Sequence, residues 1–396
     1  MLVKMLKVGF FLVLAGPILA LANSSTLLAE LTASDGHAGD EMGISVAVCG
    51  NTVVVGASEL NSSTFGAVYI FVKGSLGWAN MTQTAKLTAS DRVYGAVFGS
   101  SVACSWNTVV VGAPHQHGGE AYVFVEPSGG WSDMTETARL TSPDNGGTDD
   151  FGYSVAMKGE TIAVGAPQAS GKVGWQGKAY IFERPKGGWK TTSAFTAELT
   201  ASNAHFDNGL GASVSMSANA LVAGAPNGGG AGVAYVFVKP AAGWATTSNF
   251  TAELAASDGV DGDAFGYALS INGNTIASGA YQTNSAYIFV EPANGWVTGT
   301  ETAKVTAVNP GSNFAYSLSL GSGKLVVGSA NDPSDSAVFL YIKPMSGWKT
   351  TSTSKARLTS SDGYGFGFSV AVGGGVFVAG SIGKNNLQGA AYIFGP

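Results

Sequence analysis

The stretch F-G-S-S-V-A-C-S-W-N-T-V-V-V-G-A-P, from Phe98 to Pro114, contains two strand-like segments joined at Trp106-Asn107. Its pattern recurs along the chain. The second residue of the F-G pair is, copy by copy, Gly43, Gly99, Gly152, Gly211, Gly266, Ala315 and Gly367. The Gly of the G-A-P end follows 13 residues later in every copy, whereas the copies themselves are spaced by 49 to 59 residues. A fixed unit inside a variable repeat is typical of a rigid hairpin with insertions in the loops outside it.

The composition favours a turn-rich all-β protein. The chain has 396 residues, of which 57 are Gly, and 12% of its residues are charged against 45% hydrophobic. Few charges together with many Gly, β-branched and aromatic residues are typical of such a fold. The net charge is only -6. Because there is no basic patch, we do not expect the partner to be a nucleic acid.

Each copy supplies four strand-like pieces, which we call the first to fourth strands. The second strand is almost continuously apolar, which indicates burial on both faces. Seven four-stranded units with short links predict radial packing, as antiparallel blades of a seven-bladed β-propeller. A linear solenoid is the alternative, but it requires polar capping units. The sequence ends contain none.

The two ends of the repeat region complement one another. The last copy stops at Tyr392–Pro396, after its third strand, whereas Leu27–Thr32 resembles a fourth strand that lacks its own first three. We expect these two pieces to pair, because that closes the ring and removes two open sheet edges.

The N-terminal residues 1–22 have the features of a signal peptide. Lys4 and Lys7 precede an apolar run, and Ala20-Leu21-Ala22 fits a cleavage site. The run is too short for a membrane anchor, which needs about 20 apolar residues. We therefore expect one mature domain, 23–396, without a membrane span. It would be secreted or at the cell surface, or periplasmic in a bacterial host. The N-x-S/T sequons are at Asn23, Asn61, Asn80 and Asn249.

Two residue types invite structural interpretations. Cys49 and Cys104 lie near the same point of copies one and two but are offset by one residue. Because neighbouring side chains on a strand face opposite ways, we expect free thiols rather than a bridge. Six Trp recur at a G-W corner between third and fourth strands: Trp78, Trp131, Trp189, Trp244, Trp296 and Trp348. We interpret each as a cap over its own blade, in preference to a ligand-stacking ladder.

The F-G and G-A-P pairs with Tyr-rich third strands resemble the FG-GAP repeat family, to which the integrin α-subunit propeller belongs. The resemblance covers residues 28 to 396 and implies an integrin-like propeller with a binding or adhesive function. Several blades of such propellers carry D-x-D-x-D-G calcium loops within the hairpin. Here the corresponding links are C-G-N, S-W-N and similar, without the required carboxylates. Those calcium sites, and the adhesive residues, are not transferred to this chain.

The insertions gather in two kinds of connection, from fourth to first strand and from second to third strand. In a propeller both lie on one face, so we predict that this face binds a partner. It should hold 15 of the 26 carboxylates. An Asp or Asn four residues after the apolar residue of each fourth strand is interpreted as an Asx turn. The predicted partner residues are Asp40, Glu41, Asp149, Asp150, Trp175 and Asp207.

Two clusters are candidate metal sites. Asp258, Asp261 and Asp263 place three carboxylates within six residues. They form either an oxygen cage for Ca²⁺ or a solvated acidic turn. His115 and His117, with Glu120 nearby, have the residue types of a transition-metal site but lack a third sequence-adjacent ligand.

The sequence predicts a secreted, monomeric, non-enzymatic protein that binds a protein or glycan partner through the acidic face. It has no G-x-S-x-G elbow, H-E-x-x-H or phosphate-binding loop. The Ser two residues after the F-G pair recurs in six copies, which argues for packing rather than catalysis. Two alternatives stay open. An extracellular carbohydrate hydrolase would need two loop carboxylates about 5–9 Å apart. A lectin would show repeated exposed aromatic residues on this face, where Trp175 is the only Trp.

Overall fold

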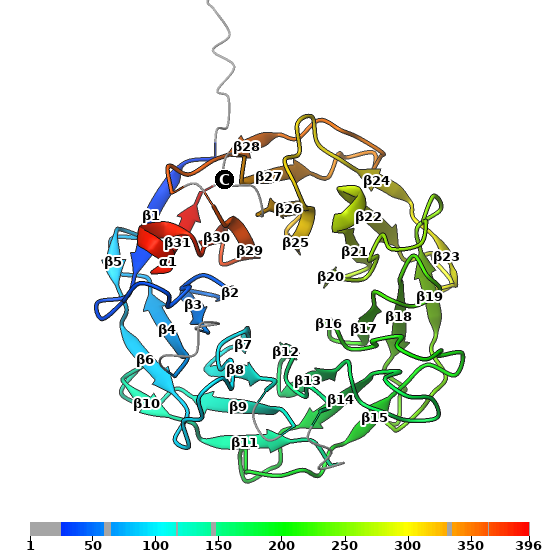
Figure 1. Ribbon diagram of the computed structural model, residues 1–396, viewed down its shortest axis with the longest axis horizontal. Coiled ribbons are helices and arrows are strands. Elements are labelled where there is room, and N and C mark those ends of the chain that lie inside the picture. Colours follow the sequence, from blue (N-terminus) through cyan, green and yellow to red (C-terminus); the bar gives the residue numbers. More distant parts are fainter. Residues whose placement is uncertain are drawn as a thin grey trace, which may run out of the picture.

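The computed structural model describes residues 25–58, 65–115, 118–143, 148–330, 335–362 and 364–395. Seven small sheets surround a central axis, so the predicted seven-bladed β-propeller is confirmed (Figure 1). The predicted leader, residues 1–22, and the sequons Asn23 and Asn61 lie outside the described residues.

Each blade has four main antiparallel strands, which follow one another from the axis outward. Blade 1 consists of β2 (Ser45–Cys49), β3 (Thr52–Ala57), β4 (Ala67–Val72) and β6 (Ala85–Thr88). Blade 2 consists of β7 (Ser101–Ser105), β8 (Thr108–Ala113), β9 (Glu120–Val125) and β11 (Ala138–Thr141). Blade 3 consists of β12 (Ser154–Lys158), β13 (Thr161–Ala166), β14 (Lys178–Glu183) and β15 (Ala197–Leu199).

The same order holds on the other side of the ring. Blade 4 consists of β16 (Ser213–Met216), β17 (Ala220–Ala225), β18 (Val233–Val238) and β19 (Ala252–Ala255). Blade 5 consists of β20 (Ala268–Asn272), β21 (Thr275–Ala280), β22 (Ser285–Val290) and β24 (Ala303–Val305). Blade 6 consists of β25 (Phe314–Gly321), β26 (Lys324–Ser329), β27 (Ala337–Ile342) and β28 (Ala356–Leu358).

Blade 7 joins the two ends of the chain. Its inner strands are β29 (Phe366–Gly373), β30 (Val376–Ser381) and β31 (Ala390–Phe394), and its fourth strand is β1 (Leu27–Thr32). β1 pairs antiparallel with β31, with Ala29 opposite Ile393. The expected closure of the ring is therefore confirmed.

Few elements lie outside the four-stranded pattern. Three two-residue strands, β5 (Met81–Thr82), β10 (Met134–Thr135) and β23 (Gly299–Thr300), pair in parallel with the fourth strand of the preceding blade. The short helical turns η1 (Tyr281–Thr283) and α1 (Lys384–Leu387) lie in connections from second to third strands. Within the described ranges no helix has the length and apolar character that a membrane crossing requires.

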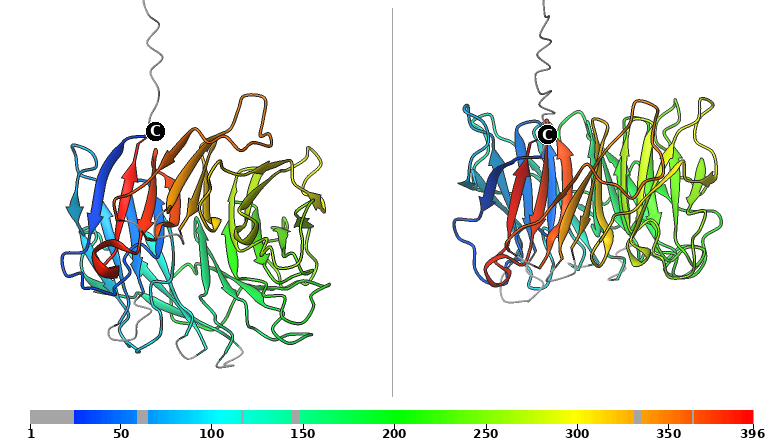
Figure 2. Two further views of the ribbon diagram at one scale, coloured as in Figure 1. Left: turned by 45° about the horizontal axis from the view of Figure 1, so that its top comes forward. Right: turned by 90° about the horizontal axis from the view of Figure 1, so that it is seen from above.

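The loops divide between two faces of the ring. The connections from fourth to first strands and from second to third strands share one face, which we call the loop face. The hairpin turns and the G-W corners lie on the other, the turn face. In Figure 2, α1 marks the loop face, and the C-terminal end lies on the opposite side.

The recurring Ser and Gly of the motif join neighbouring blades. The Ser101 hydroxyl donates a hydrogen bond of 2.9 Å to the carbonyl oxygen of Gly152, in the next F-G pair. A Cβ on Gly112 would overlap that same carbonyl, so the G-A-P position requires Gly. The equivalent bonds join Ser45 to Gly99, Ser154 to Gly211, Ser213 to Gly266, Ser317 to Gly367 and Ser369 to Gly43. The recurring Ser is therefore a packing residue, as predicted.

The hydrophobic core lies between the blades. One cluster combines Val54 of blade 1 with Val109 of blade 2, although Val109 corresponds to Val53 in the repeat. Adjacent blades thus present opposite faces to one another. The Trp of each G-W corner lies in such a seam, between its own blade and the preceding one. These six residues are Trp78, Trp131, Trp189, Trp244, Trp296 and Trp348. The expectation that each Trp caps its own blade is therefore corrected, because each ring packs between two blades.

The expectation of free thiols is wrong. Cys49 in β2 and Cys104 in β7 form a disulfide, with their Cα atoms 6.0 Å apart. The argument from strand alternation holds within one sheet, but these strands belong to adjacent blades. Because adjacent blades present opposite faces, an offset of one residue brings the two side chains together.

Candidate functional site

The six predicted partner residues fall into two groups of three. Asp40, Glu41 and Asp149 are buried. Asp150, Trp175 and Asp207 come from three different loops and line one pocket on the loop face. The pocket is therefore the place where the structure brings predicted site residues together.

The buried carboxylates close their own loops. Asp40 accepts a hydrogen bond of 2.6 Å from the amide of His37, and Asp263 accepts one of 2.9 Å from the amide of Val260. Asp149, at the same register, accepts a hydrogen bond of 3.1 Å from the Ser142 hydroxyl. These positions shape the loops, so they are poor candidates for direct contact with a partner. Glu41 is also buried, and burial raises the pKa of its carboxyl.

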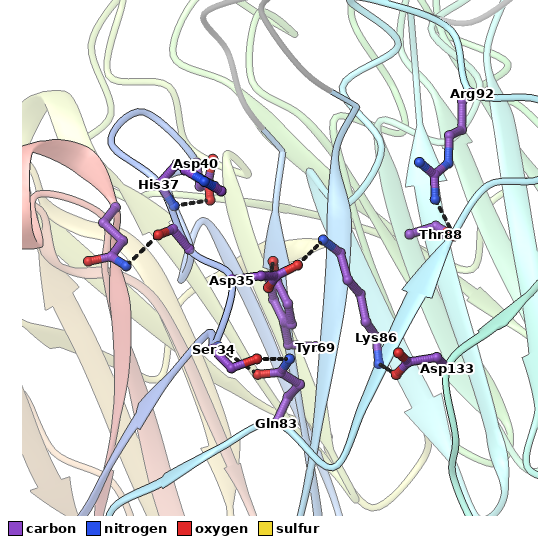
Figure 3. A network of polar contacts seen from close by, with 12 residues as sticks. Ser34, Asp35, His37, Asp40, Tyr69, Gln83, Lys86, Thr88, Arg92 and Asp133 are labelled. Carbon is purple, nitrogen blue, oxygen red and sulfur yellow. Dashed lines mark hydrogen bonds and ion pairs between the residues drawn. The ribbon is translucent and has the colours of Figure 1, made fainter.

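The predicted Asx position instead links adjacent blades. Asp35 follows β1 of blade 7, and it accepts hydrogen bonds from Lys86 at 2.6 Å and from Tyr69 at 3.0 Å, both in blade 1 (Figure 3). Burial raises the pKa of Asp35, but the ammonium and the phenol outweigh burial and hold it below its usual value. At Asp35 the structure thus shows a link of carboxylate, phenol and cation.

This link recurs around the ring. Tyr and a cation also hold Asp91, Asp258 and Asp362. The cations are Arg139, Lys304 and Lys384. Because the cations come from this chain, the loop face is less acidic than its carboxylate count predicts.

The three carboxylates of the candidate calcium loop have separate surroundings. Asp258 pairs with Lys304 at 2.5 Å, Asp263 is buried against the amide of Val260, and Asp261 is exposed. In the described part of the chain, no group of three or more His, Cys, Asp or Glu side chains is arranged to hold a metal ion. Calcium binding by this loop stays a prediction. His117 lies outside the described residues, so the two-His cluster is not described either.

The pocket on the loop face has a volume of about 360 Å³ and lies between blades 3, 4 and 5. Its walls combine carboxylates, amides and aromatic rings. Its polar and aromatic lining residues are Asp150, Tyr153, Gln168, Trp175, Asp207, Asn227 and Tyr267. Within the described ranges, no Lys or Arg lines it. Loops inserted at different points of the sequence thus converge on one polar, aromatic cavity.

Asp150 is an acid whose surroundings in the pocket perturb its pKa. It directly precedes the Phe151-Gly152 pair and has a φ of 54°, in the left-handed region. Burial raises the pKa of Asp150, against the opposing effects of His115 and of a 2.5 Å hydrogen bond from Gln168. A group that ionises reluctantly and faces a cavity is a candidate for hydrogen bonding to a ligand.

An exposed aromatic pair includes Trp175, which lines the pocket. Trp175 and Phe206 have ring centroids 5.4 Å apart, and they are 47% and 67% exposed. A second pair, Phe65 and Tyr94, has centroids 4.4 Å apart, and Tyr94 lies at the same register of its loop as Phe206. Exposed aromatic residues are therefore repeated on the loop face. Counting only Trp in the sequence missed them.

Tyrosines near the axis form the inner wall. Tyr267 and Tyr316 each follow the second residue of an F-G pair, and their hydroxyls are 2.9 Å apart. Tyr281 and Phe368 pack on Tyr316, with centroids 5.5 and 5.0 Å away. Tyr153 occupies the same repeat position and lines the pocket. The repeats themselves indicate that this position is unusual: it is Tyr in copies three, five and six, but a small residue in copies two and four.

The fold and pocket define a seven-bladed β-propeller with a ligand-sized cavity on its loop face. The model of the FG-GAP repeat matches the chain at residues 26–71, 81–124, 134–182 and 249–289. The chain is therefore an FG-GAP repeat protein, as the sequence motifs predict.

Comparison with solved structures confirms the ring. The WD40 β-propeller domain of Doa1 is 12% identical, with a TM-score of 0.57, and the match covers 94% of this chain and 97% of that one. The WD40 domain of Toxoplasma gondii coronin is 12% identical, with a TM-score of 0.55, and the match covers 94% and 84%. At such identities the likeness concerns the fold alone. No curated protein matched the sequence.

Proposed function

We propose that this propeller is a secreted, monomeric, non-enzymatic binding protein that engages a protein or glycan partner through its loop face, and that its pocket receives a sugar unit of a glycan. The observation that carries this proposal is the exposed pair of Trp175 and Phe206, in which Trp175 lines the same cavity as Asp150 and Asp207.

The chemistry of the pocket supports a sugar as its ligand. A pyranose ring offers an apolar face, which packs on an aromatic ring, and hydroxyl groups, which donate to carboxylates. Trp175 supplies the aromatic surface, and Asp150, Asp207 and Asn227 supply acceptors. A volume of about 360 Å³ lies within the usual range of ligand pockets.

The disulfide supports secretion. The bond between Cys49 and Cys104 persists in an oxidising compartment, and the sequence predicts a cleavable leader before residue 23. Asn80 and Asn249 are exposed, so both sequons are accessible in a host that glycosylates them.

A glycan array tests the proposal directly. The chain from residue 23 should bind a restricted set of neutral oligosaccharides. The substitutions Trp175→Ala and Phe206→Ala should each weaken binding by at least about fivefold, since an aromatic contact contributes about 1 kcal/mol or more. Trp106→Ala is the matched control, because Trp106 is 76% exposed in a hairpin turn on the turn face. Equal loss in all three variants would contradict the pocket assignment.

A carbohydrate hydrolase is the second candidate, favoured by one observation. Asp150 and Asp207 line the same pocket, and burial raises the pKa of Asp150 as a general acid requires. A reducing-sugar assay on each oligosaccharide that binds separates the two functions. Turnover that Asp150→Asn abolishes while binding persists would establish the hydrolase. Binding without turnover supports the binding protein.

A further inference from the structure

Two corners of the turn face carry a large apolar side chain that the other corners lack. The difference lies in the two residues before the Gly-Trp pair of each corner. In blades 2 to 5 these residues are small, polar or charged: Ser128-Gly129, Lys186-Gly187, Ala241-Ala242 and Ala293-Asn294. Blade 1 has Leu76 and blade 6 has Met345 within these two positions, and both side chains are fully exposed. The fold therefore does not require them, and they are available to a partner.

These two side chains lie on one face of the ring. A single exposed apolar residue is ordinary on a protein surface, but the corners of blades 1 and 6 both lie on the side of the C-terminal end (Figure 2). Blade 7, which lies between them (Figure 1), adds Leu27, half-exposed and opposite Phe394 at the same end of the fold. Because the two corners belong to blades that are not adjacent, one small ligand would not reach both. A flat surface would contact them together.

The turn face of blades 6, 7 and 1 is also basic. The described hairpin turns and corners of these blades contain Lys73, Lys324, Lys343 and Lys349, but no Asp or Glu. None of the four Lys forms an ion pair within the described part of the chain. The fold gathers them from distant segments, so no basic patch is apparent along the sequence. Their charge favours an anionic partner.

Two of these lysines line one pocket. Lys324, at the start of β26, and Lys343, directly after β27, line a cavity of about 190 Å³ on the turn face. The amide of Lys343 donates a hydrogen bond of 2.8 Å to the carbonyl oxygen of Gly323, which holds the corner against the hairpin turn. The described lining of the pocket contains no carboxylate. Two ammonium groups at one pocket are complementary to a phosphate group, and exposed Met345 lies two residues from Lys343.

We propose that the turn face docks on an anionic lipid surface. A lipid phosphate lies between Lys324 and Lys343, and Leu76 and Met345 enter the apolar layer beneath the headgroups. Apolar tips beside lysines fit such a surface, because the tips reach the acyl chains while the ammonium groups stay at the phosphates. The protein lies on the membrane without crossing it, and its loop face is turned toward the solution. This docking is independent of the proposed glycan binding, so either can fail alone.

Vesicle flotation tests the docking. The chain from residue 23 is used, because the apolar run of the leader would itself bind lipid. The protein should float with vesicles of phosphatidylglycerol and phosphatidylcholine in equal parts, and not with phosphatidylcholine alone. Leu76→Ser, Met345→Ser and Lys343→Glu should each weaken binding by at least about fivefold. Absence of binding to the anionic vesicles, or equal binding to both kinds, would overturn the proposal.

Two residues of the loop face provide matched controls. Val308 and Lys172 are both exposed, and they lie in connections of the loop face. Val308→Ser and Lys172→Glu should therefore leave the affinity for the vesicles unchanged. Losses equal to those of the turn-face variants would contradict the assigned face.

A fluorescent label measures the insertion itself. Cys49 and Cys104 are bonded to each other, so a Cys introduced elsewhere can be labelled alone. A solvent-sensitive dye on Met345→Cys should brighten and shift to the blue when anionic vesicles are added, whereas the same dye on Val308→Cys should not. An unchanged spectrum at Met345→Cys with vesicles bound would show attraction without insertion and would contradict the proposal. Binding of inorganic phosphate without binding of vesicles would show a site for a free anion and would also contradict it.

Discussion

Cys49 and Cys104 are bonded across the seam between blades 1 and 2, although they occupy positions of the repeat that differ by one. The bond joins the innermost strands of two blades, near the axis, whereas the closure of β1 on β31 acts at the periphery. The ring is therefore fastened both at its inner wall and at its outer rim.

The first prediction concerns this disulfide. Replacing both cysteines, Cys49→Ser with Cys104→Ser, should lower the free energy of unfolding by about 2–4 kcal/mol, because a bridge between residues 55 apart restricts the unfolded chain. Urea unfolding measures this. Reducing agent should bring the wild-type midpoint to that of the variant and leave the variant unchanged. A wild-type midpoint that reductant does not move would contradict the prediction.

Gly224 provides the second prediction. A Cβ at this position would overlap the carbonyl oxygen of Gly266 in the next blade. Gly224→Ala should therefore destabilise the protein by about 3 kcal/mol, through separation of blades 4 and 5. Gly129→Ala is the control, since its Cβ would meet nothing within 4 Å. Thermal unfolding of both variants should show a loss for Gly224→Ala alone; equal midpoints would refute the packing argument.

The links between blades predict an acid-dependent stability. The hydrogen bond from Lys304 holds the pKa of Asp258 below its usual value, so the folded state favours the ionised carboxylate. This contribution is present above the unfolded pKa of about 3.9 and is lost as pH falls through the lower folded pKa. Asp258→Asn should cost up to about 1 kcal/mol at pH 7, because the pair is half-exposed, and nothing at strongly acidic pH.

Melting temperatures of wild type and variant, measured from pH 7 down to pH 2, follow this difference. Asp261→Asn serves as the control, because Asp261 is exposed in the same loop. A constant difference across the pH range would show that the loss comes from packing rather than from charge.

For Asp150 the effect of pH on the stability of the fold has the opposite sign. Burial raises its pKa, so the folded protein gives up stability as pH rises from about 3.9 through the folded value. Asp150→Asn keeps an acceptor for Gln168 and removes the charge. It should stabilise the protein by about 1 kcal/mol or less at pH 7, have no effect below pH 3, and weaken glycan binding. A destabilised variant at pH 7 would mean that the carboxylate has a structural partner.

The propeller could be predicted because its determinants are repeated. The constant spacing from Gly99 to Gly112 indicates a hairpin whose Gly and Ser contact the next blade. Because every blade needs the same contacts, the same residues recur at the same spacing in each copy. The closure of the ring was predictable from Leu27–Thr32, because a fourth strand that lacks its own first three strands can pair with the incomplete last blade.

The site was only partly predictable, because loop residues do not repeat. Asp150, Trp175 and Asp207 were placed on the correct face and meet in the pocket. Asp40 and Asp149 are the same residue type as Asp150 and Asp207 and lie in the same kind of loop, but they are buried. The sequence does not reveal which carboxylate turns inward, and it does not show that Lys86 and Lys304 reach across a seam to neutralise Asp35 and Asp258.

The closure of the ring also orders events during synthesis. β1 is the first described strand of the chain, and its partner β31 is the last. The edge of β1 therefore stays unpaired until β31 has been made, and the earlier blades fold before the ring can be completed. An open strand edge can pair with another chain, so the interval before closure is the stage at which this protein is most prone to aggregate.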